Sequence, residues 1–197
     1  MIIYYNSKEE KLLKQLEKMH SSSQKINLNN SIGELKCILL DKPHYLTSVQ
    51  VNRDGLLGSL RRIECAYRWC EKAPLNYEGS DKREALTLVF FHNSKCFIEI
   101  LKKCFIKFSS NKKNKKVFHE ITTIRDLFAH SYEKDFFGKK TFIRININHQ
   151  FNKGLFELEV FNFDTSKKIY GIFFSLSVFL SEIEELVKEL INHIKKN

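Results

Sequence analysis

Apolar side chains recur at helical spacing along most of this chain, and few residues interrupt the pattern. Only 7 of the 197 residues are glycine and 2 are proline, a composition that favours long regular elements over loops. Apolar residues that return every three or four positions lie on one face of a helix. Hydrophobic residues make up 43% of the chain, which is enough for a real core. The sequence therefore predicts a mainly α fold, with one domain over residues 1–197.

The first part of the chain, to about residue 50, is expected to be a helical extension. Ser7 and Glu10 form a capping box in front of an apolar run, which predicts a helix over about residues 8–20. A second, short helix would begin near Ser31 and stop at Pro43.

The middle of the chain, about residues 54–135, is expected to form the helical bundle itself. Asp54 is the expected N-cap of its first helix. The longest helix would cover about residues 80–107. Residues 107–116 hold five lysines and no acid, and we expect them to form a solvated loop. Helical periodicity resumes immediately after this loop and continues to Phe128.

Strand periodicity replaces helical periodicity beyond Gly138. Apolar and polar residues alternate in two runs on either side of Asn152-Lys153-Gly154, which predicts an inserted β-hairpin over about residues 141–163. The chain then returns to helical spacing in a long C-terminal helix over about residues 169–195. The apolar face of this helix is broad, which indicates a central helix or a dimer interface.

The chain carries a net charge of +10, and a basic surface attracts polyanions such as RNA. The densest charge is a lysine cluster made of Lys112, Lys113, Lys115 and Lys116. These lysines are candidates for holding an RNA backbone by charge, without reading its bases. A surface loop without a ligand explains the cluster equally well, and an AT-rich genome would also raise the lysine content.

The cysteine pattern and the start of the chain indicate a reducing cytoplasm. Five cysteines occur with no Cys-x-x-Cys pair, which is typical of free thiols. The first residues lack a basic segment followed by an apolar run, so no signal peptide is expected. No stretch reaches the about 18 apolar residues of a membrane span. The sequence predicts a cytoplasmic protein with no membrane partner.

The densest group of chemically useful side chains lies between residues 124 and 132. It comprises Arg125, Asp126, His130, Ser131 and Tyr132, with the spacing R-x4-H-x-Y. An arginine stays protonated and grips phosphate with two N–H groups, while a histidine transfers protons near neutral pH. RNA cleavage by its own 2′-hydroxyl needs both kinds of group and requires no metal. These residues are therefore candidates for a ribonuclease site.

Each motif residue has an expected role in that reaction. Arg125 would hold the scissile phosphate, and His130 would act as general base or acid. Asp126 would position either of them, and Tyr132 or Ser131 would contact the RNA. On a continuous helix Arg125 and His130 would lie about 140° apart and about 7.5 Å apart along the axis. They converge only if the helix ends near residue 129, or if a second copy of the motif faces the first.

The stretch Arg125-Asp126-Leu127-Phe128-Ala129-His130 resembles the ribonuclease motif of the HEPN superfamily, R-x4-6-H. In that motif a polar residue commonly follows the arginine, and a small residue often precedes the histidine. The resemblance implies a HEPN-like helical bundle that forms a homodimer and brings two motifs into one cleft. Arg125 and His130 would then be catalytic, with Asp126 in support.

The longer form that ends at Tyr132 looks like HEPN toxins paired with nucleotidyltransferase antitoxins of the MNT type. By this resemblance the antitoxin adenylylates Tyr132 and silences the nuclease. The predicted hairpin, the last helix and the residue 1–50 extension are additional to the minimal toxin bundle.

Two other interpretations of the same residues stay open. Arg125 and Asp126 can be an exposed helix pair, with His130 donating to the last carbonyls of the helix. MtlR-like regulators also carry a helix that ends in a similar R-x-x-F-A-H-S string, matched here through Ser131. That resemblance implies a non-catalytic regulator, or an adaptor that binds nucleic acid or protein.

One further pair has the spacing of metal ligands. His92 and Cys96 stand at i and i+4, which is half of a zinc site. No second pair with suitable spacing accompanies them in the sequence. We therefore expect a packed pair of side chains, and neither a metal nor another cofactor.

Overall fold

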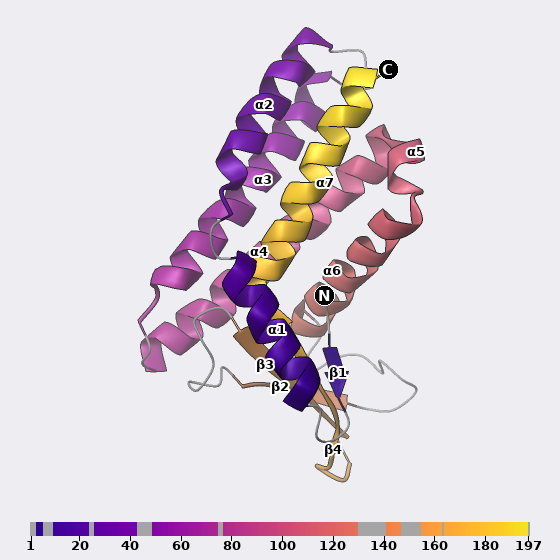
Figure 1. Cartoon of the computed structure of the whole chain (residues 1–197). Coiled ribbons are helices and arrows are strands. Elements are labelled where there is room, and N and C mark those ends of the chain that lie inside the picture. The colour runs from indigo at the N-terminus through magenta and orange to yellow at the C-terminus, as the bar shows by residue number, and fades with distance from the viewer. Residues whose placement is uncertain are drawn as a thin grey trace.

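A helical bundle with a small antiparallel sheet at one end makes up the protein (Figure 1). The computed structural model describes residues 3–5, 10–23, 26–42, 49–74, 77–129, 141–146, 155–162 and 164–196. The helices are α1 (Glu10–Ser23), α2 (Leu28–Asp41), α3 (Val49–Lys72), α4 (Tyr77–Cys104), α5 (Ile106–Ser109), α6 (Lys112–Ala129) and α7 (Leu176–Lys196). The strands are β1 (Ile3–Tyr5), β2 (Thr141–Asn146), β3 (Leu155–Asn162) and β4 (Lys168–Ser175). The predicted mainly α class, with a hairpin and a long C-terminal helix, is confirmed.

Helix α7 is the central helix of the bundle. Its buried side chains recur on every turn between Leu176 and Ile194. It contacts α1, α2, α3 and α6, and it follows directly from the sheet (Figure 1). The central position accounts for the broad apolar face that the sequence shows in this segment.

Phenylalanine rings join the bundle to the sheet. Phe91 of α4 lies 5.5 Å from Phe174 of β4 and 5.1 Å from Phe179 of α7, measured between ring centroids, and both pairs are edge-to-face. Phe156 of β3 stacks on Phe174 at 5.2 Å. Aromatic pairs at these separations are favourable beyond the area they bury. A continuous core therefore extends from the helices into the sheet.

The sheet is antiparallel, with four strands in the order β1-β4-β3-β2. Strands β2 and β3 are the two arms of the predicted hairpin, with Arg144 opposite Glu159. The turn expected at residues 152–154 lies outside the described residues. The hairpin does not stand alone, because β4 pairs with β3 and the N-terminal strand β1 pairs with β4.

The C-terminal helix begins later than predicted, because the first part of the 169–195 segment is a strand. Residues 168–175 form β4, and α7 starts at Leu176. The β4 sequence is rich in isoleucine and aromatic residues, which fit a pleated sheet. Its apolar residues also match a helical period, so the local sequence pattern does not distinguish a strand from a helix here. Pairing with β3 and β1 decides in favour of the strand.

The lysine-rich segment 107–116 is helical, so the loop prediction for it was wrong. It holds most of α5 and the start of α6. Asn111 caps α6, since its Oδ1 accepts a hydrogen bond from the backbone N–H of Lys113 at 2.9 Å. Buried Asn114 donates from Nδ2 to the carbonyl of Phe108 at 3.0 Å and ties the two helices together. These polar contacts stabilise the helical structure of the segment, and the number of lysines in the sequence does not predict them.

The N-terminal region is helical over α1 and α2, but it also contains β1. Helix α2 begins at Leu28, before Ser31, because Asn27 is the N-cap and accepts from the backbone N–H of Asn29 at 3.2 Å. Leu28 and Leu35 are fully buried in the main core. This part of the chain is therefore built into the bundle as well as preceding it in sequence.

Helices α3 and α4 also begin earlier than predicted, at Val49 and Tyr77. Asp54 lies within α3 and accepts from Nε of Arg53 at 3.2 Å, so it is not the N-cap. The two helices pack closely as antiparallel neighbours, for example where Nε of Arg62 donates to Oδ1 of Asn93 at 2.7 Å. Their lengths follow from this mutual packing more than from single capping residues.

All five cysteines are free thiols, as the sequence predicted. Cys37 and Cys65 are exposed, and Cys70 is buried. None of the helices in the described part of the chain is long and apolar enough to cross a membrane. The cytoplasmic location itself stays a prediction.

Candidate functional site

Helix α6 carries the first half of the motif near its C-terminal end. Ile124 and Leu127 are buried in the core, which turns the residues between them outward. Arg125 and Asp126 keep 23% and 29% of their side chains exposed. Ala129, the last residue of α6, is exposed. The polar motif residues thus lie at a partly covered surface.

Phe128 fixes this end of α6 against the rest of the molecule. Its ring stacks on Phe91 of α4, with centroids 6.4 Å apart and an angle of 21° between the planes. It also meets Phe174 of β4 edge-on at 6.3 Å. The motif therefore contains a packing residue of its own, and this residue holds the helix end on both α4 and the sheet.

Asp126 gathers two cations around one carboxylate oxygen. Its Oδ1 accepts from Nη1 of Arg125 at 2.7 Å and from Nζ of Lys95 at 3.2 Å. Lys95 belongs to α4, so this ion pair fixes the register of α4 against α6 beside the motif. The group of three carries a formal charge of +1, and such a group attracts a phosphate.

The same contacts shift the pKa of Asp126. Partial burial works to raise this pKa, but the hydrogen bonds from Arg125 and Lys95 outweigh burial. The pKa of the Asp126 carboxyl is therefore below its usual value, and the group is ionised at neutral pH. Its negative charge orients Arg125, which is one of the roles that the sequence predicts for it.

Arg125 keeps part of its hydrogen-bonding capacity. Its Nε is buried and has no acceptor among the described residues. One of its terminal nitrogens, Nη1, is taken by Asp126. A guanidinium has five N–H donors, so Arg125 can hold its own carboxylate and still donate to a phosphate.

The second half of the motif lies outside the described residues. His130, Ser131 and Tyr132 follow directly after the last described residue of α6. The convergence of His130 with Arg125, within one chain or across a dimer, therefore stays a prediction. The roles expected for Tyr132 and Ser131 stay predictions for the same reason.

The four lysines of the predicted RNA-binding cluster point to different places. Lys113 donates to Glu189 at 2.7 Å and to Glu185 at 3.2 Å on α7, and these hydrogen bonds raise its pKa. Lys116 lies 3.9 Å from Glu120. Lys112 is exposed, and Lys115 lines a pocket between α4 and α6. All four side chains are exposed, and RNA binding by the lysine cluster stays a prediction.

Lys95 is a site residue that the sequence analysis missed. It stands 31 residues before Asp126, and no motif includes it. Only the pairing of α4 with α6 brings the two together. The same pairing places Lys102 of α4 beside His119 of α6 in the pocket that Lys115 lines.

The described residues contain no group of three or more potential metal ligands. His92 and Cys96 lie next to each other on α4, with Nε2 and Sγ 3.8 Å apart, as a packed pair. Comparison with protein-family models, with curated proteins and with solved structures finds no match to this chain.

Proposed function

We propose that the protein is a metal-independent endoribonuclease of the HEPN type. The reaction transfers the scissile phosphate to the 2′-oxygen of the preceding ribose. A base removes the 2′-proton, the 2′-oxygen attacks phosphorus, and an acid protonates the departing 5′-oxygen. The products are a 2′,3′-cyclic phosphate and a 5′-hydroxyl. His130 supplies the proton transfer and Arg125 stabilises the charge on the phosphorane.

The observation that carries this proposal is the position of Arg125 and Asp126. Both lie at the end of α6 that leads directly into His130. Arg125 is partly exposed and oriented by a carboxylate that Lys95 also holds. A pre-positioned cation costs little reorganisation when a phosphate binds. This arrangement supports a phosphate site at the motif.

The biological setting we propose is defence, or a toxin–antitoxin pair, in the cytoplasm. RNA is the substrate, and a homodimer would place two copies of the motif in one cleft. Tyr132 would be the point of control, adenylylated by a nucleotidyltransferase antitoxin. These proposals rest on the R-x4-H-x-Y spacing, and the net charge of +10 supports a polyanionic partner.

A cleavage assay with total RNA in excess EDTA tests the proposal. We expect cleavage to survive the chelator, and we expect His130→Ala to abolish it together with any growth toxicity. His92→Ala is the matched control, because His92 is exposed on α4 and its one side-chain contact within the described residues is the long one to Cys96. If His130→Ala cuts RNA as fast as the parent protein, the proposed function is wrong.

A specific observation favours a second candidate, a non-catalytic regulator or adaptor of the MtlR-like kind. Arg125 is ion-paired with Asp126, and only 23% of its side chain is exposed. An arginine in that state can have a purely structural role, in which it supports the Asp126 carboxylate that also binds Lys95 of α4. Under this second candidate the parent protein leaves total RNA intact in the same assay, and Arg125→Ala changes stability alone.

A further inference from the structure

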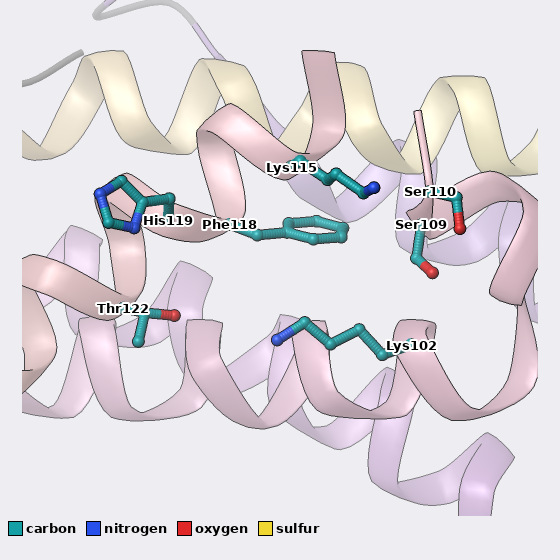
Figure 2. A pocket seen from close by; sticks show the side chains of 7 residues that line it. All are labelled: Lys102, Ser109, Ser110, Lys115, Phe118, His119 and Thr122. Atoms are coloured by element: carbon teal, nitrogen blue, oxygen red, sulfur yellow. The ribbon is translucent and has the colours of Figure 1, made fainter. Parts of the chain in front are cut away.

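A pocket of about 460 Å³ opens between α4, α5 and α6 (Figure 2). This volume lies in the range of small-ligand sites, which is about 300–1,000 Å³. Three elements and the turn between α5 and α6 contribute side chains to it. The lining residues are Lys102, Ser109, Ser110, Lys115, Phe118 and His119, with Thr122.

The charge of this pocket is positive. Lys102 and Lys115 line it from opposite helices, and no carboxylate is among its lining residues. The ammonium of Lys102 donates to Glu99, one turn earlier on α4, at 3.0 Å. Lys115 and His119 have no side-chain hydrogen bond or ion pair with any residue that the structure describes, and both are exposed. An anion is the ligand that this lining favours.

Each end of the pocket holds an ammonium group. In Figure 2 the ammonium of Lys102 points toward the end formed by His119 and Thr122, and the ammonium of Lys115 points toward the end formed by Ser109 and Ser110. The hydroxyls of Ser109 and Ser110 lie at this second end. Both serine hydroxyls donate to the carbonyl of Ile106, at 2.9 and 2.8 Å. Their oxygen atoms are therefore left as acceptors for a ligand N–H or O–H.

Phe118 forms the apolar middle of the pocket. Its ring lies between the chains of Lys115 and Lys102 (Figure 2) and is 4% exposed. A matching ligand has an anionic group at each end, a flat apolar middle and a hydrogen-bond donor that reaches the serines. One nucleotide within a strand has these groups, because a phosphate lies on either side of its ribose, and its ribose and base carry hydroxyl and amino groups.

The pocket and the motif lie along the same pair of helices. Lys95 of α4 pairs with Asp126 of α6, and Lys102 of α4 lines the pocket together with His119 of α6. The end formed by His119 and Thr122 is the end of the pocket nearer Arg125 along α6. His119 and Arg125 are separated by about 9 Å along the helix axis and about 120° around it, whereas Thr122 lies about 60° from Arg125. A strand that runs from Arg125 past Thr122 can therefore continue into this pocket.

We propose that this pocket binds one nucleotide of a single-stranded RNA, a short distance along the strand from the phosphate at Arg125. One of its two flanking phosphates lies against Lys102 and His119, the other lies against Lys115, and its donors reach the oxygens of Ser109 and Ser110. The placement next to the cleaved bond rests on the proposed function, whereas nucleotide binding by the pocket does not. The contacts hold a strand by charge and shape, without reading a base sequence.

The test removes the two ammonium groups by the double substitution Lys102→Gln and Lys115→Gln. The matched control is Lys103→Gln with Lys107→Gln, two exposed neighbours that do not line the pocket. Affinity is measured for a 2′-O-methyl RNA oligonucleotide, which cannot undergo cleavage through its 2′-oxygen. Two further probes are a nucleoside 5′-monophosphate and inorganic phosphate.

We expect the pocket variant to lose about tenfold or more of its affinity for the oligonucleotide at low salt, and the control to lose little. The slope of log K against log salt should fall in magnitude by about 1.4 for two lost phosphate contacts on a single strand. Equal losses in the two variants would overturn the proposal. If a nucleoside monophosphate or inorganic phosphate binds as tightly as the oligonucleotide, the pocket does not bind an RNA strand and the proposal is overturned.

This test separates the pocket from the nuclease. If the parent protein binds the oligonucleotide through the pocket but never cleaves RNA, the proposed function fails and the pocket stands. If RNA is cleaved in a His130-dependent way but the pocket variant binds like its control, the pocket proposal fails alone. Normal circular dichroism of both variants shows that the exposed substitutions leave the fold intact.

Discussion

Lys95 of α4 donates to Oδ1 of Asp126 of α6 at 3.2 Å, and through this contact the longest helix supports the motif. The same oxygen accepts from Arg125 at 2.7 Å. A carboxylate shared by two cations holds both of them near one point of the surface. The proposed ribonuclease activity requires a phosphate to bind at this point.

Replacing Asp126 with asparagine tests its electrostatic role. Hydrogen bonds from Arg125 and Lys95 keep the folded pKa of Asp126 below its usual value, against the effect of burial. The carboxylate therefore stabilises the fold above the unfolded pKa of about 4 and loses this effect as the pH falls through the folded pKa. We expect Asp126→Asn to lower the free energy of unfolding at pH 7 by about 1 kcal/mol or less, since the pair is partly exposed.

Urea unfolding of the parent and of Asp126→Asn at pH 7 and at acidic pH measures this difference. The gap between the two proteins should close as the pH drops below the folded pKa of Asp126. A gap that grows toward acidic pH would contradict the assigned ion pair. Asp164→Asn is the matched control, because Asp164 is exposed and has no ion pair within the described chain.

Truncating Phe128 should weaken the end of α6. Its ring packs on Phe91 and Phe174, at 6.4 and 6.3 Å between centroids. We expect Phe128→Ala to lower the free energy of unfolding by about 2–3 kcal/mol, because the ring is partly buried and its loss opens a cavity. Phe128→Leu should recover much of this loss. Thermal and urea unfolding give the values, and an alanine variant as stable as the parent would contradict the packing role.

Removing His20 should destabilise the junction between α1 and the sheet. His20 is fully buried, and its Nδ1 lies 2.8 Å from Oγ of Ser175 and 2.8 Å from Oγ of Ser177. Removing the imidazole leaves the two buried serine hydroxyls without this hydrogen-bond partner. We therefore expect His20→Ala to lower the free energy of unfolding by about 2–3 kcal/mol, as measured by urea unfolding. His92→Ala, at an exposed position, should cost little. Equal effects of the two substitutions would contradict the network.

Cys70 should resist alkylation in the folded protein. Burial raises the pKa of its thiol to about 11, against the lowering effect of the neighbouring Thr87 and Arg83 side chains. The reactive thiolate is therefore scarce at pH 8, and access is blocked as well. Iodoacetamide at that pH should label the exposed Cys37 and Cys65 first, as peptide mass spectrometry would show. Labelling of Cys70 at the same rate would mean that this part of α3 opens readily.

The sequence predicted the elements whose side chains follow one period. The alternation in Ile143 to Ile145 and in Phe156 to Leu158 predicts β2 and β3, and both strands are present. It missed β4, because the same isoleucine and phenylalanine residues satisfy a helix and a strand equally well. Only the hydrogen-bonded partners in β3 and β1, which are distant in sequence, separate the two.

The structure shows Arg125 and Asp126 ion-paired and partly exposed, while their catalytic roles stay predictions. Phe128 has a packing role that the motif does not reveal. Lys95 could not be predicted, because its place depends on the register of two helices. A charge count carries no direction, whereas the helix sends Lys113 toward α7 and Lys115 toward α4, and RNA binding by the lysine cluster stays a prediction.

The most direct test of the central claim is single-turnover cleavage of a short RNA in EDTA by the parent, Arg125→Ala, His130→Ala and the double variant. The account predicts that each single variant is slower by about 100-fold or more. It predicts that the double variant is little worse than either, because the two groups act on one transition state. Mass spectrometry should find a 2′,3′-cyclic phosphate on the parent's product. Cleavage by His130→Ala at the parent's rate, or no cleavage by the parent at all, would contradict the claim.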